Sequence, residues 1–244
     1  MKKWILRIVL FCIIIVGIIV GIFVYNGHEL YKSALNAVSL SDKVDKIQKD
    51  ENYIKLEDLP TDYKNAVISV EDRRYYQHGP IDLIGISRAV FTNLKNMQFL
   101  EGGSTITQQV AKNLYFISPD ENAAHRKVAE VFMASDLEKA YGKDVVLELY
   151  VNTIYFGDGY YGIQEASQGY FNKDAKDLTL FDATMMAGIP NAPSSYAPTV
   201  NMDLALSRQR KVISTMVENK YISQSQADEL IKQQDDFKIF TDEY

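Results

Sequence analysis

The first 25 residues constrain the fold more than any other part of the chain, because they contain a long segment with almost no polar side chains. Ile8 to Val24 is an unbroken apolar run, and Trp4 to Leu6 extend the hydrophobic stretch toward the N-terminus. At about 1.5 Å per residue, a helix from Trp4 to Tyr25 is roughly 33 Å long, enough to cross a bilayer if Arg7 reaches the interface. The sequence therefore predicts a transmembrane helix.

A cleaved signal peptide is the alternative, since Lys2 and Lys3 resemble the charged start of such a peptide. The apolar run is longer than a usual signal-peptide core and no A-x-A-like site follows it, which favours an uncleaved anchor. The cations Lys2, Lys3 and Arg7 predict a cytoplasmic N-terminus, with Trp4 and Tyr25 as interfacial aromatics. Everything after Tyr25 is then expected outside the cell.

The composition fits one exported domain without disulfides. A chain of 244 residues is long enough for a single hydrophobic core in addition to the anchor. Its one cysteine, Cys12, lies inside the apolar run, so the exported part must be stabilised by packing. Apart from the three N-terminal cations, 23 Lys and Arg stand against 32 Asp and Glu. This acidic balance argues against nucleic acid as a partner.

The chain divides by pattern into four parts. Residues 1–25 form the cytoplasmic tip and anchor, and residues 26–55 are polar with a weak helical pattern that suits a stem. Residues 56–235 form the main domain, and residues 236–244 form a tail.

The main domain is predicted to be mainly α-helical, because apolar residues recur there at helical spacing. Such spacing covers residues 83–97 and 123–141, with a stop at Gly142 and a new run from Asp144. Further helix starts are indicated at Thr179 with Asp182, at Asp203, and at Ser223 with Gln226. Pro190 is expected to end the helix that Thr179 opens. Residues 155–162 and 190–198, rich in Gly, Pro and Asn, are predicted to be irregular.

Four polar clusters lie within this helical framework. They are Glu71–Asp82 (EDRRYYQHGPID), Glu101–Asn113 (EGGSTITQQVAKN), Arg126–Glu130 (RKVAE) and Lys143–Asn152 (KDVVLELYVN). Each has an ordinary structural explanation when taken alone. Ser104 or Thr105 would serve as a helix N-cap, and Arg126 with Glu130 would form a surface pair at i, i+4.

Several chemistries are excluded by missing motifs. The chain has no P-loop, no HExxH and no D-x-D pair, and its three histidines show no metal-ligand spacing. No serine is followed three residues later by lysine, and S-D-N and K-T-G are also missing, so the penicillin-binding signatures are not found.

Taken together and in this order, the four clusters carry a specific combination of motifs. They read E-D-x-R-[FY]-Y-x-H…D, then G-G-S-T-I-T-Q-Q-x-x-K-N, then R-K-x-x-E, then K-D-x-x-L-E-x-Y-x-N. This combination resembles the peptidoglycan glycosyltransferases of glycosyltransferase family 51, over roughly residues 56–216. Two departures occur in the first motif, where Tyr75 replaces the commoner Phe and the glycine after His78 is displaced. The anchor and the missing penicillin-binding signatures point to the monofunctional branch of the family.

The resemblance implies a fold and a reaction. The expected fold is a lysozyme-like helical head with a smaller membrane-associated jaw, to which Phe91, Leu94, Met97, Phe99 and Leu100 are assigned as an apolar surface, with ordinary core packing as the alternative. The expected reaction is polymerisation of lipid II into β-1,4-linked glycan, with inversion and release of undecaprenyl pyrophosphate. Moenomycin-type phosphoglycolipids are expected to inhibit it.

The resemblance also assigns roles to individual residues. Glu71 is the expected general base for the acceptor hydroxyl, and Glu130 is the second essential carboxylate. Substrate contacts, including cations for the pyrophosphate, are assigned to Arg74, Arg88, Ser104, Gln108, Lys112, Arg126 and Lys127. A carboxylate base suits this chemistry because the hydroxyl is a poor nucleophile at neutral pH, and fixed cations suit a leaving pyrophosphate.

Cofactors and partners follow from the same assignment. No dedicated metal site and no obligatory cofactor are predicted, although Mg²⁺ or Mn²⁺ is compatible with the pyrophosphate. The expected partners are lipid II, the growing glycan strand and the bacterial cell membrane, with cell-wall synthesis proteins as further candidates. Two other functions remain open: a glycan-cleaving enzyme with two glutamates in a lysozyme-like cleft, and a membrane scaffold without catalysis.

Overall fold

The computed structural model describes residues 2–98, 102–118 and 122–241, with side chains from Trp4 to Gln234. Across these ranges the chain is built from α-helices and short 3-10 helices without a strand, apart from one isolated bridge between Tyr155 and Tyr161. The mainly α fold predicted from the sequence is confirmed. Phe99, Leu100 and Glu101, which belong to the predicted jaw and to the second polar cluster, lie outside the described residues.

The α-helices are α1 Lys2–Ala37, α2 Leu40–Gln48, α3 Thr61–Glu71, α4 Leu83–Asn96, α5 Ile106–Tyr115, α6 Ala123–Thr153, α7 Ile163–Phe171, α8 Leu180–Gly188, α9 Pro193–Tyr196, α10 Met202–Glu218 and α11 Gln224–Thr241. The 3-10 helices are η1 Leu56–Asp58, η2 Tyr75–Gln77, η3 Ala175–Asp177 and η4 Ile189–Asn191.

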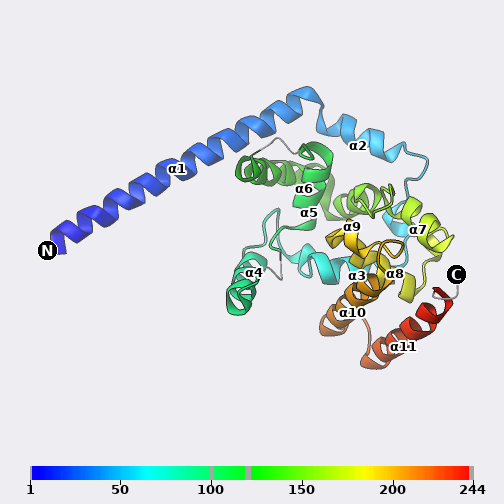
Figure 1. The fold of residues 1–244 in the computed structure, drawn as a ribbon. Coiled ribbons are helices and arrows are strands. Elements are labelled where there is room, and N and C mark those ends of the chain that lie inside the picture. Colours follow the sequence, from blue (N-terminus) through cyan, green and yellow to red (C-terminus); the bar gives the residue numbers. More distant parts are fainter. Residues whose placement is uncertain (1, 99–101, 119–121, 242–244) are drawn as a thin grey trace.

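The core of the body forms around α6 (Figure 1). Helix α5 packs along α6, while α3, α8 and α10 pack against one another beside them. Leu137, Leu147 and Leu149 of α6 are fully buried, as are Met186 of α8 and Val212 of α10. Because the core is shared by helices from both halves of the chain, it holds the polar clusters of the sequence at fixed positions.

Most predicted helix boundaries are confirmed. Gly142 has φ 73° and ψ 175°, so α6 kinks where the sequence predicts a stop. Thr179 and Asp182 form the predicted capping box of α8, which ends at Gly188 just before Pro190. Ser223 and Gln226 exchange the expected bonds at the start of α11. The start of α10 differs, because Asn201 rather than Asp203 caps it by accepting a hydrogen bond from Leu204 N–H.

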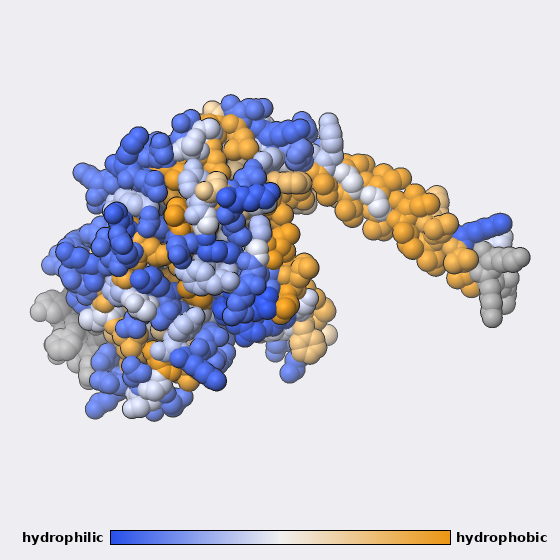
Figure 2. All heavy atoms as spheres, turned by 180° about the vertical axis from the view of Figure 1, so that it is seen from behind, coloured by the Kyte–Doolittle hydropathy of each residue, from blue (hydrophilic) through white to orange (hydrophobic). Residues whose placement is uncertain are grey.

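Helix α1 is the one helix of the described residues that is long and apolar enough to cross a membrane. Its N-terminal part stands away from the body, and in the space-filling view it forms an apolar rod (Figure 2). The apolar side chains from Trp4 to Val24 are exposed, as membrane lipid requires. Within the described residues, α1 is therefore the one candidate for a membrane anchor.

The C-terminal part of α1 is packed onto α6, so the segment predicted as a stem is not a free spacer. Phe23 contacts the His125 ring with the ring centroids 5.3 Å apart, and His28 contacts Phe132 at 4.9 Å. The Tyr31 hydroxyl donates a hydrogen bond to Asp136. The anchor continues without interruption into a helix that is fixed to the body.

Helix α4 exposes an apolar surface on the side of the body from which the rod emerges (Figures 1 and 2). Phe91, Leu94 and Met97 are 69%, 73% and 93% exposed, and Leu83 and Ile84 are exposed as well. These residues are not core, which rules out the alternative that the sequence left open for Phe91, Leu94 and Met97. An apolar surface formed by several neighbouring exposed side chains, on the same side as the apolar rod, is suited to contact with a bilayer.

Gly27 provides a test of the contact between α1 and α6. A Cβ at Gly27 would lie 2.4 Å from Val128 Cβ and 2.8 Å from the His125 carbonyl oxygen, so Gly27→Ala must push the helices apart. We expect a destabilisation of about 1–3 kcal/mol, which lowers the midpoint of thermal unfolding by about 2–4 °C for each kcal/mol. Gly21→Ala is the matched control, because no atom lies within 4 Å of its added Cβ. Equal midpoints for the two variants would show that this contact does not stabilise the protein.

Candidate active site

A polar cleft of about 540 Å³ lies where the end of α3, α5, the start of α6 and α10 meet. Its charged lining residues are Glu71, Arg73, Arg88, Lys112, Lys127, Glu130, Arg208, Lys211 and Glu218. Cations outnumber carboxylates in this lining, although the whole chain has a formal net charge of −6. The cleft is therefore suited to an anionic ligand.

Glu71 is the last residue of α3 and lies in the wall of the cleft. Its Oε2 accepts a 2.8 Å hydrogen bond from Gln109 Nε2 of α5, and its Oε1 lies 3.8 Å from Arg208 of α10. Burial raises the pKa of Glu71, and the Gln109 hydrogen bond and the Arg208 charge only partly oppose this shift. A carboxylate with a raised pKa at a cleft wall is suited to accepting a proton.

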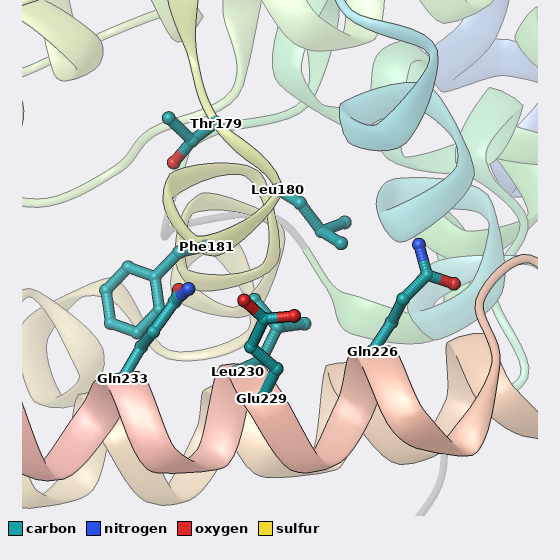
Figure 3. Close-up of a pocket in the computed structure, with 7 residues that line it drawn as sticks. All are labelled: Thr179, Leu180, Phe181, Gln226, Glu229, Leu230 and Gln233. Atoms are coloured by element: carbon teal, nitrogen blue, oxygen red, sulfur yellow. The ribbon is translucent and has the colours of Figure 1, made fainter.

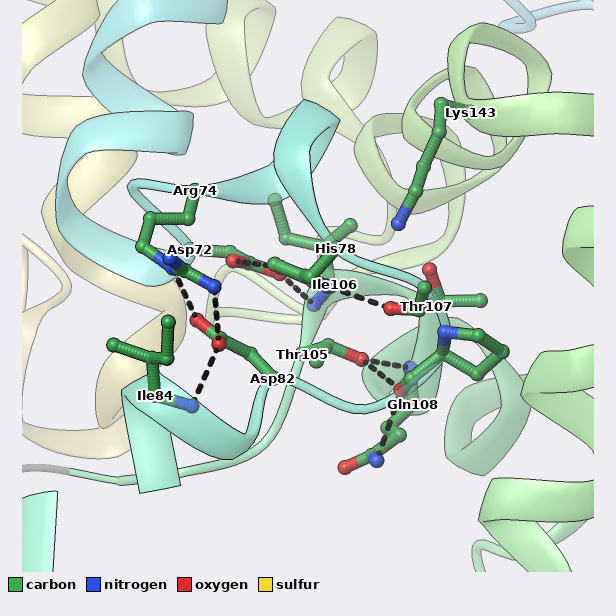
Figure 4. Close-up of polar contacts among 12 residues, drawn as sticks. Asp72, Arg74, His78, Asp82, Ile84, Thr105, Ile106, Thr107, Gln108 and Lys143 are labelled. Atoms are coloured by element: carbon green, nitrogen blue, oxygen red, sulfur yellow. Dashed lines mark hydrogen bonds and ion pairs between the residues drawn. The ribbon is translucent and has the colours of Figure 1, made fainter. Parts of the chain in front are cut away.

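The residue after Glu71 fixes the position of the cleft wall (Figure 4). Asp72 ends α3, and its Oδ2 accepts a 3.1 Å hydrogen bond from Ile106 N–H at the start of α5. Its Oδ1 lies 2.7 Å from His78 Nε2, and both side chains are about 95% buried. One carboxylate thus joins the end of α3, the His78 loop and the N-terminus of α5.

The start of α5 is also hydrogen-bonded to the loop that contains His78 and Pro80. Thr105 rather than Ser104 is the N-cap, because its Oγ1 accepts the Gln108 N–H. The Thr105 hydroxyl and the Gln108 side-chain amide both donate to the Pro80 carbonyl oxygen at 3.0 Å. Gln108 lines the cleft but is 2% exposed, so it also holds the loop in place.

Glu130 lies in the cleft lining with two cations from its own helix. It is 4% exposed, and its Oε2 lies 2.9 Å from Lys127 Nζ while Oε1 lies 3.5 Å from Arg126 Nε. Lys127 also donates a 2.8 Å hydrogen bond to Ser104 Oγ. The pair of Arg126 with Glu130 is therefore not the solvent-exposed pair that the sequence allowed. It belongs to a group in which Glu130 is buried, Arg126 is partly buried, and the more exposed Lys127 lines the cleft.

The structure brings most of the predicted site residues together. Glu71, Arg88, Ser104, Gln108, Lys112, Lys127 and Glu130 all line the cleft. Two predicted contacts are placed differently. Arg126 is not among the lining residues and pairs with Glu130. Arg74 donates two hydrogen bonds to Asp82, at 2.9 and 3.1 Å. Burial alone would raise the pKa of Asp82, but the bonds from Arg74 and Gly85 N–H hold it below its usual value.

The sequence interpretation missed Gln109, Arg208 and Lys211, which also line the cleft. Gln109 adjoins Gln108 in the second cluster, and only their different contacts distinguish the two amides. Arg208 and Lys211 lie three residues apart on α10, far along the chain from the other clusters. Their spacing on one helix face was the available signal, but an exposed face produces the same pattern.

The cluster Asp72, His78 and Asp82 has ligand-type atoms within 4.8 Å of one another. These atoms already have partners: Asp72 binds His78 and Ile106 N–H, and Asp82 binds Arg74 and Ile84 N–H. A divalent cation would have to displace the Arg74 guanidinium. The cluster is therefore better explained as structural support for the cleft wall.

Another hollow, of about 340 Å³, lies between α8 and α11 (Figure 3). It is lined by Thr179, Leu180, Phe181, Gln226, Glu229, Leu230 and Gln233. This lining offers no cation and one carboxylate, so it lacks the charges that distinguish the cleft between α3 and α10.

The chain is similar in sequence to a known family and to several known proteins. The sequence model of the family described as Transglycosylase matches residues 39–217. Penicillin-binding protein 1A of Neisseria lactamica is 41% identical over 215 residues, covering 87% of this chain and 27% of that protein. Penicillin-binding protein 1F of Bacillus subtilis is 43% identical over 174 residues, covering 71% of this chain and 24% of that protein.

A crystal structure of penicillin-binding protein 1A from Haemophilus influenzae aligns with a TM-score of 0.45 and 23% identity, covering 74% of this chain and 17% of that one. The chain spans about a quarter of the length of the two relatives. The family match includes the end of α3, all of α5 and the start of α6, which supply Glu71, Lys112 and Glu130. The chain belongs to the transglycosylase family.

Proposed function

We propose that this protein is a peptidoglycan glycosyltransferase that polymerises lipid II into β-1,4-linked glycan by an inverting displacement. The observation that carries the proposal is the pairing, in one cleft, of a carboxylate with a raised pKa and a separate group of cations. Family membership supports the same reaction.

Glu71 acts as the general base. The acceptor 4-hydroxyl loses its proton to this carboxylate while its oxygen attacks the donor anomeric carbon, and such assistance contributes about 10²–10⁴-fold to rate. A raised pKa brings the group closer to the working pH, which favours proton transfer in the transition state.

The leaving undecaprenyl pyrophosphate carries the bonding electron pair away as negative charge. Lys112 and Lys127 stabilise this charge, a role supported by their position in the cleft lining together with Arg88 and Ser104, the latter accepting a hydrogen bond from Lys127. Glu130 holds Lys127 and Arg126 in position through its two oxygens. We propose that these cations make a metal non-obligatory, and that Mg²⁺ or Mn²⁺ adds to them when it accompanies the pyrophosphate.

The membrane geometry suits a lipid-linked substrate. The anchor and the apolar surface of α4 lie on one side of the body, and Arg88 of α4 lines the cleft. We propose that the N-terminus is cytoplasmic and that the domain works on the outer face of a bacterial cell membrane, as the cations Lys2, Lys3 and Arg7 indicate. Lipid II and the growing strand then enter beside the bilayer, where cell-wall synthesis proteins are candidate partners.

The proposal predicts that the purified full chain, reconstituted in vesicles, converts labelled lipid II into glycan strands longer than a disaccharide. Electrophoresis or chromatography that resolves products by length measures this directly. A glycan-cleaving enzyme would instead shorten preformed glycan and leave lipid II unchanged. That result would overturn the assignment, because the cation group would then have no leaving pyrophosphate to stabilise.

Substitutions of Glu71 and Glu130 should have different effects on turnover and on ligand binding. Glu71→Gln keeps the shape of the side chain but removes the proton acceptor, so turnover should fall by roughly 10²–10⁴ while a moenomycin-type ligand still binds. Glu130→Gln removes the charge that positions Lys127 and Arg126, so both turnover and ligand affinity should fall. Turnover and ligand dissociation constants are measured for both variants. A Glu71→Gln enzyme that keeps more than about a tenth of wild-type turnover would remove Glu71 from the role of base.

The cations can be tested with a matched surface control. Lys112→Ala removes a cation from the cleft lining, and we expect at least about a tenfold loss in kcat/KM for lipid II. Arg126→Ala should also impair turnover, and Arg126→Lys should not fully restore it, because a lysine lacks the planar guanidinium. Lys139→Ala is the control, since Lys139 is exposed on α6 away from the cleft. Wild-type kinetics for Lys112→Ala and Arg126→Ala would leave the pyrophosphate role unsupported.

A further inference from the structure

The two oxygens of Glu71 have different surroundings. Oε1 is fully buried and accepts no hydrogen bond from any residue in the described part of the chain. Oε2 accepts the 2.8 Å hydrogen bond from Gln109. The Glu71 side chain as a whole is 11% exposed, so its accessible surface lies elsewhere than at Oε1. A substrate hydroxyl in the cleft therefore cannot reach Oε1 directly.

The groups around Glu71 come from each helix packed on it. Arg208 of α10 lies 3.8 Å from Oε1, and Asp72 follows Glu71 in the chain. Tyr63 of α3 and Tyr150 of α6 are completely or almost completely buried, and burial first and the Glu71 charge second raise the pKa of both hydroxyls. Both tyrosines are therefore neutral at physiological pH. Gln109 is the neutral donor on the Oε2 side.

We propose that Gln109 is a positioning residue for the base: it holds Glu71 by Oε2 and thereby selects that oxygen as the atom that takes the acceptor's proton. This inference rests on the proposed function of Glu71. In the step, the acceptor O–H bond breaks and its proton goes to a free lone pair of Oε2. The acceptor oxygen forms the new bond to the anomeric carbon, and the pyrophosphate leaves with the electron pair of the broken bond.

The neighbouring amide shows that this contact is specific to Gln109. Gln108 and Gln109 are adjacent in α5, but the Gln108 amide donates to the Pro80 carbonyl oxygen while the Gln109 amide donates to Glu71. Adjacent residues on a helix point about 100° apart, so one amide supports the loop and the other holds the base. The hydrogen bond from Gln109 also favours the charged carboxylate, because a carboxylate is the stronger acceptor.

The test measures the pH dependence of Glu71 with and without the Gln109 donor. kcat/KM for lipid II should fall at low pH as Glu71 becomes protonated, and this fall is the acid limb of the pH profile. In Gln109→Met, the acid limb should move to higher pH by about one unit, because the Glu71 carboxylate loses a hydrogen bond. The Glu71 carboxyl pKa, read by ¹³C NMR of glutamate-labelled full chain in nanodiscs, should move by the same amount. The Glu71→Gln spectrum identifies the resonance. Gln109→Glu, which keeps the side-chain shape but adds a like charge, should shift it further.

The controls separate positioning from folding. Gln168→Met removes an exposed amide that binds Asp174 far from the cleft, and it should leave both the rate and the acid limb unchanged. Gln108→Met should lower the rate without moving the acid limb. Suppose that Gln109→Met leaves both the acid limb and the Glu71 pKa as in the wild type, while Glu71→Gln is inactive. This result would overturn the positioning role of Gln109 and leave the proposed function standing. An active Glu71→Gln would overturn both.

Discussion

The cleft depends on one buried carboxylate, that of Asp72. A buried charge is stable only when it is paired and hydrogen-bonded, and Asp72 meets this requirement with His78 and with the Ile106 N–H at the start of α5. The N-terminus of a helix carries partial positive charge, so this contact is favourable beyond the single bond. Because Glu71 precedes Asp72, the same contact sets where the proposed base stands relative to α5, which supplies Gln109 and Lys112.

The distribution of charge in the cleft follows from how each carboxylate is held. Glu130 is buried and pairs with the more exposed Lys127 and Arg126 of its own helix, and this close pairing offsets much of the cost of burying the carboxylate. Glu71 accepts a hydrogen bond from the Gln109 amide at Oε2 and lies farther from the Arg208 guanidinium. These two contacts lower its pKa by less than burial raises it, so the pKa is raised. Two glutamates in one cleft thereby acquire different properties: Glu71 is suited to proton transfer, and Glu130 to organising cations.

The apolar N-terminal segment and the cleft are connected through the packing of α1 on α6. Helix α1 continues past the apolar segment and packs on α6 through Gly27, His28 and Tyr31, and α6 also supplies Lys127 and Glu130 to the cleft. The apolar surface of α4 lies on the side from which the anchor emerges. The position of the cleft relative to the anchor is therefore set by helix packing, which suits the lipid-linked substrate proposed above.

The sequence by itself determined the apolar N-terminal helix, the mainly helical class, most of the helix boundaries that it predicted and the set of polar clusters. It did not predict α3 or α7, and it predicted the segment that contains α9 to be irregular. The predicted features depend on local composition and periodicity, as the capping box of Thr179 and Asp182 and the kink at Gly142 show. The family also follows from the sequence, because its motifs have fixed order and spacing. The tertiary structure alone decided that Arg74 binds Asp82, that residues 26–37 pack on α6, and that Arg208 reaches Glu71 from α10. Those contacts join residues distant along the chain or choose among several nearby partners, and no local pattern specifies which partner a side chain meets once helices pack.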